Sequence, residues 1–217
     1  MRSRFALFIL VLLLIFGLLF WLLWRRLRTK HHQQLRVLHE AYPRPTFERL
    51  RQYLEASVDI RAEPKEKNEL ADRSSVKLDP KDFPLVYELL DTHSFGLRNA
   101  RVSREVPVEY RIYKKGSFGM NWHQDVRVLP EEIKYYEVTL TLSNSSDNRF
   151  EYVAPKNFSG KLPGAHVSVN TSENRDVRSV QTPANTVVFV PPESVRHRAT
   201  ALKYGERLFL KFVIEYD

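Results

Sequence analysis

The chain has 217 residues and no cysteine, which leaves room for one domain with a core plus an appendage and excludes disulfides, zinc–thiolate sites and thiol nucleophiles. Its formal net charge of +8 at pH 7 comes mainly from residues 25–51, because residues 52–217 contain 24 basic and 24 acidic residues. A neutral main body argues against general nucleic-acid binding, which needs an excess of positive charge.

A long apolar segment lies near the N-terminal end. Residues 5–24 form an unbroken apolar run, which as a helix rising about 1.5 Å per residue would span a bilayer core of about 30 Å. The run ends in tryptophan and then arginine, without the small residues of a cleavage site, which favours a retained anchor over a signal peptide. We therefore predict a single-pass membrane protein in which residues 1–30 are an anchor, with a basic flank among lipid headgroups.

The side of the membrane that would hold the remaining chain stays open. The positive charge that follows the apolar run favours a cytoplasmic C-terminal domain. Three glycosylation sequons are instead typical of a lumenal domain. They begin at Asn144, Asn157 and Asn170.

Residues 31–75 are predicted to be a helical stalk and linker. Residues 33–56 have a helical composition interrupted by two prolines, and Leu50 and Leu54 share one helix face. Residues 61–75 are polar and mixed in charge, which predicts an exposed linker or loop.

The rest of the chain changes from helical to strand-like patterns. A second helix is predicted to start at Asp79, with this residue as N-cap and Pro80 at the first helical position. Beyond Val106, about eight short alternating or β-branched runs in about 110 residues indicate a sandwich or jelly roll, not a parallel α/β sheet. The predicted strands are 108–113, 135–142, 150–153, 166–170, 177–181, 186–190, 195–202 and 208–216.

A histidine and an aspartate stand two residues apart in the segment N-W-H-Q-D-V-R-V. Side chains alternate along a strand, so His123 and Asp125 would project from one side and could bind a single cation. The H-x-D pattern is a weak signal without a third ligand. The histidines downstream are His166, in a loop-like setting after Pro-Gly-Ala, and His197, which is followed ten residues later by Arg207.

The chemistry of these residue types favours His197 as the third ligand. Two histidines and one carboxylate on one side of a metal leave coordination positions open, as in the facial triad of non-haem Fe(II) oxygenases. An arginine that points into the same barrel is suited to hold an anionic co-substrate bidentately beside the metal. Lys211 shares the strand face of Arg207 by the period-two rule.

Two motifs carry a resemblance to a known family. They are Y-K-K-G-S-F-G-M-N-W-H-Q-D and H-R-A-T-A-L-K-Y-G-E-R. Through them residues 108–216 resemble the catalytic domain of the iron(II)- and 2-oxoglutarate-dependent dioxygenases, closest to the prolyl 4-hydroxylase-like branch. The resemblance implies a mainly β, double-stranded β-helix (jelly roll) with supporting helices, which we place at residues 76–217. It implies iron ligation by His123, Asp125 and His197.

The resemblance also implies a site for the far carboxylate of 2-oxoglutarate. Arg207 is expected to pair with this carboxylate and Tyr113 to donate a hydrogen bond to the co-substrate, with Thr141 near another co-substrate position. Lys211 is an alternative anchor because it shares the face of Arg207. We favour Arg207, since its planar fork matches a carboxylate better than a point charge does.

The predicted function is that of a membrane-anchored dioxygenase that uses Fe(II), with 2-oxoglutarate and dioxygen as co-substrates and ascorbate as a reductant. The substrate is open: a protein or peptide is favoured, with peptidyl proline the default by resemblance and nucleic acid disfavoured. The region S-N-S-S-D-N-R-F-E-Y-V-A-P replaces the glycine-rich turn usual in prolyl hydroxylases. The alternatives are an oxidative nucleic-acid or small-molecule dioxygenase, a zinc or nickel hydrolase or isomerase on a cupin-like barrel, and a non-catalytic cupin-like binding module.

Overall fold

The computed structural model describes residue 17 and residues 35–153, 166–170, 175–193 and 195–217, with side chains omitted for 166–170, 175 and 176. Residues 35–217 form one compact unit. Its strands are β1 (Arg36–Leu38), β2 (Glu66–Lys67), β3 (Ala71–Leu78), β4 (Arg101–Val102), β5 (Val108–Lys114), β6 (Gly119–His123), β7 (Lys134–Asn144), β8 (Arg149–Val153), β9 (His166–Asn170), β10 (Arg175–Gln181), β11 (Thr186–Val190), β12 (His197–Ala199) and β13 (Glu206–Tyr216). Its helices are α2 (Arg44–Ser57) and α3 (Pro84–Leu90).

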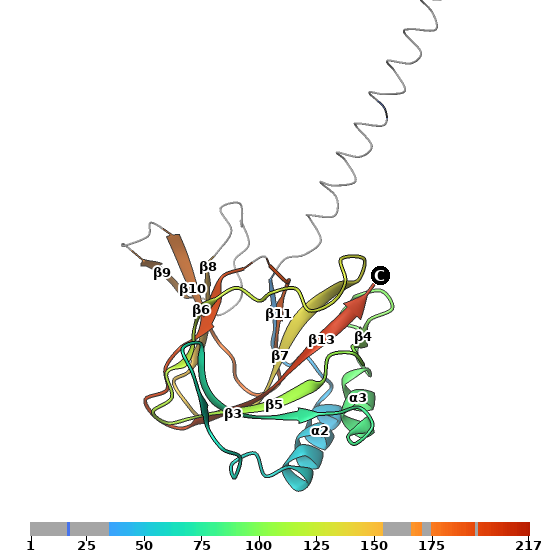
Figure 1. Cartoon of the computed structure of the whole chain (residues 1–217), viewed down its shortest axis with the longest axis horizontal. Helices are drawn as coiled ribbons and strands as arrows, with labels where there is room; N and C mark the ends of the chain where they lie inside the picture. Colours follow the sequence, from blue (N-terminus) through green and yellow to red (C-terminus); the bar gives the residue numbers. More distant parts are fainter. Residues whose placement is uncertain (1–16, 18–34, 154–165, 171–174, 194) are drawn as a thin grey trace, which may run out of the picture. The chain divides into compact units, whose positions relative to one another are not determined.

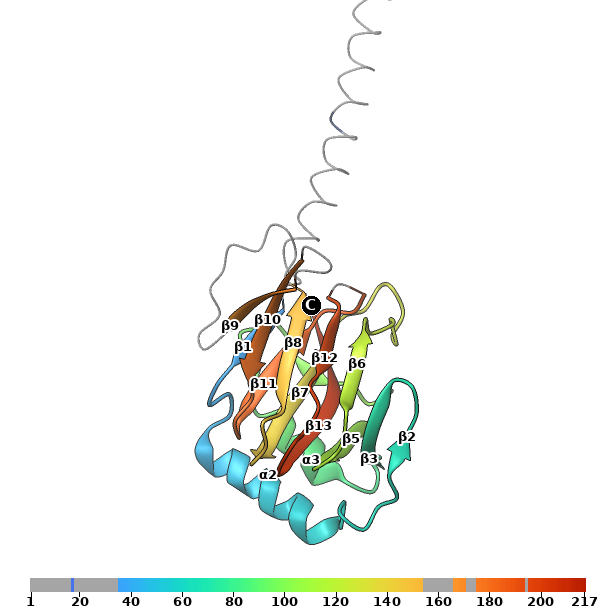
Figure 2. The same ribbon diagram turned by 90° about the vertical axis from the view of Figure 1, so that its left-hand side faces the viewer.

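The strands form an antiparallel sheet that curls back on itself (Figures 1 and 2). The strand order is β1-β11-β7-β13-β5-β3-β6-β12-β8-β10-β9, and β2 and β4 are added at β3 and β13. β3 joins the two halves of the sheet, because residues 74–78 pair with β5 whereas residues 71–72 pair with β6. This curled, mainly β sheet agrees with the predicted jelly roll.

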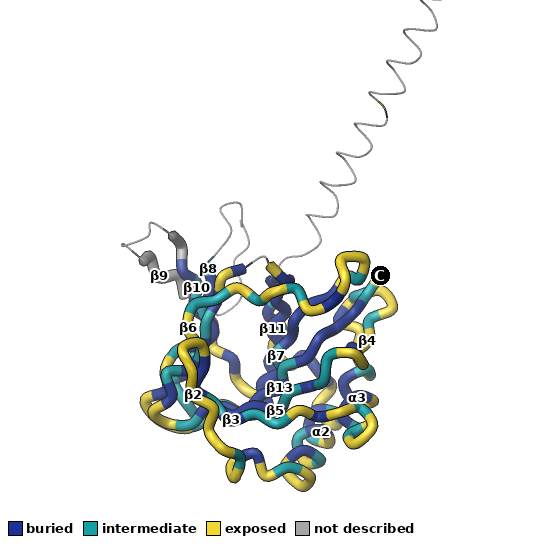
Figure 3. Tube along the Cα trace, in the orientation of Figure 1, coloured by how far each residue is buried: buried dark blue, intermediate teal, exposed yellow. Residues whose placement is uncertain are grey.

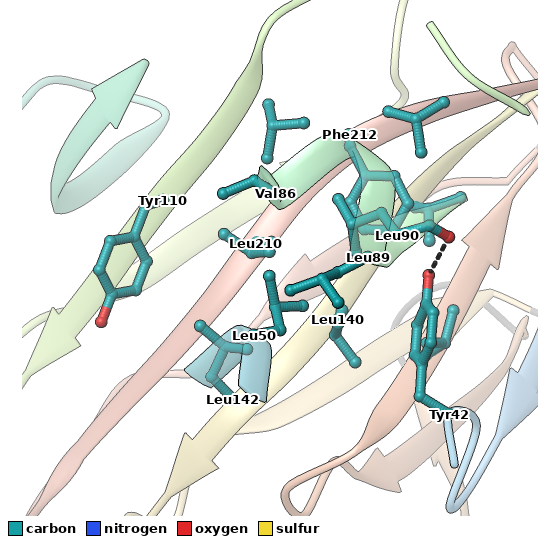
Figure 4. Packing of buried hydrophobic residues seen from close by; sticks show 14 of the residues in the cluster. Tyr42, Leu50, Val86, Leu89, Leu90, Tyr110, Leu140, Leu142, Leu210 and Phe212 are labelled. Atoms are coloured by element: carbon teal, nitrogen blue, oxygen red, sulfur yellow. Dashed lines mark hydrogen bonds between the residues drawn. The ribbon is translucent and has the colours of Figure 1, made fainter. Parts of the chain in front are cut away.

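Both helices pack on the outer face of the half-sheet that contains β5, β13 and β7 (Figures 1 and 4). Proline opens each helix, at position 45 in α2 and at position 84 in α3, where its missing N–H is not needed. Their apolar faces meet apolar side chains of β7 and β13, which run through the structure almost continuously buried (Figure 3). The Tyr42 hydroxyl donates to the Leu90 carbonyl at 3.0 Å and so attaches the start of α2 to the end of α3 (Figure 4).

The segment 31–75 differs from the predicted stalk and linker, because its described part belongs to the compact unit. β1 pairs with β11, α2 buries Phe47, Leu50 and Leu54, and β3 is an inner strand of the sheet. The segment of β3 was predicted to be a linker because many of its side chains are polar. In the structure Asp72 is buried there and forms an ion pair with Lys65 at 2.7 Å. Tertiary pairing decides the conformation where the hydrophobic pattern is weak.

The second predicted helix starts later than expected. Asp79 does not cap a helix; its Oδ1 accepts a hydrogen bond from the Lys81 N–H at 2.9 Å and forms a turn. α3 begins at Pro84, after Phe83 in the N-cap position. The helix buries Val86, Tyr87, Leu89 and Leu90.

The prediction of a single-pass membrane protein in contact with lipid is corrected. Of the helices in the described part of the chain, none is both long and apolar enough to cross a bilayer. α2 has 14 residues and α3 has 7, whereas a spanning helix needs about 20 apolar residues. Residues 5–24, on which the prediction was based, lie outside the described residues apart from Gly17.

The integration of α2 leads to a testable stability prediction. Leu50 is fully buried in the core cluster shared by α2, β7 and β13, so Leu50→Ala is expected to lower the free energy of unfolding by about 2 to 5 kcal/mol. Arg49→Ala, at an exposed position one residue earlier, is the matched control and should change it by less than about 0.5 kcal/mol. Urea unfolding of both variants measures the difference; equal midpoints would mean that α2 does not belong to the core.

Candidate metal centre

Two side chains close in sequence, His123 and Asp125, meet the distant His197 at the paired strands β6 and β12. His123 ends β6, Asp125 follows two residues later outside the strand, and His197 opens β12. The Oδ1 atom of Asp125 lies 3.5 Å from His123 Nε2, and its Oδ2 atom lies 3.4 Å from His197 Nε2. Ligand atoms of all three residues lie within 4.8 Å of one another, the only such group that the described residues form. Together they can bind one cation.

Backbone carbonyls orient both imidazole rings. His123 and His197 are register partners of β6 and β12, and their ring centroids lie 4.3 Å apart. Nδ1 of His123 lies 2.8 Å from the Asn121 carbonyl oxygen, and Nδ1 of His197 lies 3.0 Å from that of Val195. Because a carbonyl oxygen can only accept, each ring carries a proton on Nδ1, which leaves Nε2, on the side of Asp125, as the nitrogen available to bind a metal. This is the arrangement of a metal-binding histidine.

The electrostatics of the site favour the metal-binding protonation states. Burial lowers the pKa of His197 to about 4, because the charged ring would be poorly solvated. Burial alone would raise the pKa of Asp125, but the facing His123 and the ammonium of Lys211 outweigh it and hold that pKa well below its ordinary value. At neutral pH the site therefore offers an unprotonated imidazole at His197 and a carboxylate, so neither must release a proton to bind a metal.

A glycine allows β6 to approach β12 closely enough to bring the two histidines together. Gly119 has a φ of +77°, and a Cβ at this position would collide with the carbonyl oxygens of Ala199 and Thr200. The pairing register shifts between His197 and Ala199. Such irregularities re-aim side chains next to active sites.

A buried guanidinium lines the same pocket as the three metal-ligand candidates. Arg207, on β13, is 2% exposed; its Nη1 donates to Asn148 Oδ1 at 2.9 Å and its Nη2 to Thr141 Oγ1 at 3.1 Å. Its Nε has no hydrogen-bond partner, and no carboxylate forms an ion pair with the guanidinium, among the described residues. Burial lowers that pKa to about 10, so the group stays charged at neutral pH. A buried cation without a counter-ion is costly, and an anionic ligand would compensate it.

Tyr113 lies beside this guanidinium. It is the register partner of Arg207 on β5, is 2% exposed, and stacks on Phe209 with ring centroids 5.2 Å apart. The Phe209 ring also lies under the guanidinium, 4.9 Å from its central carbon. The structure thus brings together Arg207, Tyr113 and Thr141, the three residues predicted to contact the co-substrate.

Lys211, the alternative anchor, lies elsewhere in the pocket. Its Nζ is 2.5 Å from Glu137 Oε2 and 3.3 Å from Asp125 Oδ1. Burial and the nearby Asp125 charge raise the pKa of Glu137 despite its ion pair with Lys211. Lys211 is therefore a neighbour of the Asp125 carboxylate, a candidate metal ligand, and is already paired.

Sequence reasoning missed two polar residues of the pocket region. Glu137 shares the β7 face of Thr141 by the period-two rule, so a charge in an otherwise apolar strand was an available signal. Asn148 is 1% exposed and connects Arg207 to the Thr200 carbonyl, to which its Nδ2 donates. It lies in a polar turn between β7 and β8, where no periodicity distinguishes it.

Comparison with known proteins identifies the fold. No protein-family model and no curated protein sequence matches the chain. Among solved structures, a Pseudomonas putida prolyl-4-hydroxylase has a TM-score of 0.54 at 12% identity, over 86% of this chain and 95% of its own. HygX from Streptomyces hygroscopicus, with nickel and 2-oxoglutarate bound, has a TM-score of 0.55 at 16% identity, over 88% and 86%. A Trichoplax adhaerens prolyl hydroxylase in complex with a hypoxia-inducible-factor peptide has a TM-score of 0.52 at 8% identity, over 86% and 85%.

These likenesses define the class of fold. The chain has the curled β fold of the 2-oxoglutarate- and iron(II)-dependent oxygenases, over nearly the full length of each compared structure. The resemblance to the prolyl 4-hydroxylase-like branch, stated from the sequence motifs, is confirmed for the fold.

Proposed function

We propose that the chain is an Fe(II)- and 2-oxoglutarate-dependent dioxygenase that hydroxylates an organic substrate. One observation carries the proposal: a single pocket contains the His123–Asp125–His197 group and a buried Arg207 that has no acidic partner among the described residues. A metal site alone would fit many enzymes. The additional anion site fits a co-substrate that must bind beside the metal.

The donor set fits a ferrous ion. His123, Asp125 and His197 would hold the metal through two imidazole nitrogens and a carboxylate, which leaves coordination positions open. With 2-oxoglutarate, the bound iron supplies the activation of dioxygen: one oxygen atom goes to the substrate, and the other oxidises 2-oxoglutarate to succinate and CO2. Among the described residues no cysteine, third histidine or further carboxylate joins the group, which disfavours a closed structural zinc site.

The chain's own residues bind and orient the co-substrate. Arg207 receives the far carboxylate on its fork, where the unpartnered Nε is one available donor. Thr141 accepts a hydrogen bond from the guanidinium, and Tyr113 lies on the neighbouring strand. These two residues determine the side of the guanidinium on which the ligand binds. Apolar side chains of the pocket wall exclude water around the metal and the co-substrate. They are Phe150, Val190, Ala199 and Phe209. All of these residues lie within 76–217, which we propose as the catalytic region.

Peptidyl proline is the substrate class that we propose. Two of the compared structures are titled as prolyl hydroxylases, one of them with a bound peptide. Val126 is 74% exposed and Val128 is 47% exposed directly after Asp125, which offers an extended peptide an apolar surface next to the metal ligands. A small polar molecule is the second candidate, because the HygX fold was also solved with hygromycin B bound.

An activity assay tests the proposed function. Purified protein with Fe(II), ascorbate and 2-oxoglutarate is expected to release succinate when given a matching member of a prolyl-peptide panel, and Asp125→Asn should release none. Release with aminoglycosides but not with peptides would move the substrate to the small-molecule class. Absence of any 2-oxoglutarate binding in an anaerobic Fe(II) titration, followed by the weak visible charge-transfer band, would refute the dioxygenase. Zinc in protein purified anaerobically, with hydrolase activity, would support the cupin-like alternative.

A further inference from the structure

Lys211 occupies an unusual position between two carboxylates. Its ammonium forms an ion pair with Glu137 Oε2 at 2.5 Å and lies 3.3 Å from Asp125 Oδ1. All three side chains are largely withdrawn from water, with 23% of Lys211, 5% of Glu137 and 9% of Asp125 exposed. They line the same pocket as the two histidines. A lysine is therefore in contact with a proposed metal ligand.

The position of Lys211 along β13 separates it from the co-substrate anchor. Arg207 and Lys211 stand four residues apart on one strand, or about 13 Å along its axis. Because Lys211 contacts Asp125 whereas Arg207 contacts Thr141 and Asn148, the lysine lies at the metal end of the pocket. Its task differs from that of Arg207.

The neighbouring acids have different partners. Glu109, the register partner of Lys211 on β5, is bound by Arg111, whose Nε donates to it at 2.7 Å. Glu137 forms its ion pair with Lys211, and the described residues supply no other cation within ion-pair distance of it. Without Lys211, Glu137 would be a buried carboxylate with no ion-pair partner among the described residues, and only the more distant charge of Arg111 would face it.

The same contact restricts Asp125. Its Oδ2 faces His197, whereas its Oδ1 faces both His123 and Lys211. A carboxylate binds a metal through one oxygen or both, and an ammonium bound to one oxygen makes binding through both unfavourable. Loss of the ammonium would free two oxygen atoms, one on Asp125 and one on Glu137, to take further metal positions.

We propose that Lys211 is a positioning residue that keeps Asp125 a one-oxygen metal ligand and keeps Glu137 off the metal, so that positions stay open for a chelating co-substrate. The proposal rests on the proposed function. It assigns the Glu137–Lys211–Asp125 arrangement to the control of co-substrate binding, in addition to any contribution it makes to folding. Because Lys211 forms its ion pair with Glu137, removing the Glu137 carboxylate should restore co-substrate binding in a variant that lacks Lys211.

The experiment compares Lys211→Met with the double variant Lys211→Met/Glu137→Gln, and uses Glu137→Gln alone as the matched control. Anaerobic Fe(II)-loaded protein is titrated with 2-oxoglutarate, and the visible charge-transfer band gives the Kd. Visible spectra of the Co(II)-loaded forms, without 2-oxoglutarate, report changes in metal coordination. In Lys211→Met we expect the Kd for 2-oxoglutarate to rise by about 10- to 100-fold, the range for residues that orient metal ligands, with an altered Co(II) spectrum. The double variant should return to within about threefold of Glu137→Gln.

Two results would overturn the proposal. The first is a Lys211→Met protein that binds 2-oxoglutarate like the wild type, or whose loss Glu137→Gln does not rescue. The second is a Lys211→Met protein that fails to fold even when loaded with metal, while the double variant folds and binds normally; Lys211 would then only balance charge in the fold. A wild-type protein without any 2-oxoglutarate band would instead refute the proposed function itself, so the two failures are distinguishable.

Discussion

Arg207→Met is expected to weaken 2-oxoglutarate binding strongly while leaving metal binding intact. The guanidinium of Arg207 is buried, and its Nε has no partner in the described part of the chain. A carboxylate bound to it would therefore form an ion pair that is fully withdrawn from water. Removing one partner of such a pair costs about 3 to 5 kcal/mol, which corresponds to an increase in Kd of about 150- to 5,000-fold. The three metal-ligand candidates do not contact Arg207 and should still bind Fe(II).

Arg207→Met should weaken ligand binding but increase the stability of the ligand-free protein. Methionine removes a buried charge that costs several kcal/mol, against about 1 to 3 kcal/mol for leaving the acceptors of Asn148 and Thr141 unpaired. We therefore expect the free energy of unfolding without ligand to rise by on the order of 1 kcal/mol. Denaturant unfolding with and without 2-oxoglutarate measures both effects, with Arg207→Lys as the charge-retaining control. Unchanged 2-oxoglutarate affinity in Arg207→Met would place the co-substrate elsewhere.

The strands after residue 106, apart from β6, could be predicted because their signal is local. β7 and β13 each place apolar or β-branched residues in long runs, and their predicted limits lie within two residues of those observed. β3, with the sequence A-D-R-S-S-V-K-L, has no such pattern. It is a strand because β5 and β6 pair with its two ends and because Lys65 balances the buried Asp72. These partners are distant in sequence, so the polar segment was predicted to be a linker.

The surroundings of the two cations in the candidate site, Arg207 and Lys211, could be predicted to different extents. The family resemblance implied that Arg207, Thr141 and Tyr113 share one co-substrate, and the structure has them together. The period-two rule put Lys211 on the same face, but it does not say which groups from other strands meet that face. Glu137 comes from β7 and Asp125 follows β6, so the contacts of Lys211 depend on the closure of the sheet. Distances across the curled sheet are absent from the sequence pattern.

Asp125→Asn is expected to weaken Fe(II) binding strongly and to stop succinate release, because Asp125 is the only carboxylate in the group of three ligand candidates among the described residues. A structural zinc site binds its metal with about 10 to 16 kcal/mol, which is about 2.5 to 4 kcal/mol for each of its four ligands. Loss of one ligand on this scale raises the Kd for Fe(II) by about 70- to 900-fold. The amide keeps the shape of the side chain, and Lys211 keeps its ion pair with Glu137, so the fold should persist.

The control for this variant is Val126→Ala, at an exposed position next to Asp125, which should bind Fe(II) with unchanged affinity. Anaerobic Fe(II) titration and circular dichroism of both proteins separate loss of the metal from loss of the fold. A folded Asp125→Asn protein that binds Fe(II) as tightly as the wild type would show that the ion is held by other groups. His123 and His197 would then face each other for a reason unrelated to metal, and the dioxygenase proposal would fail with its central ligand.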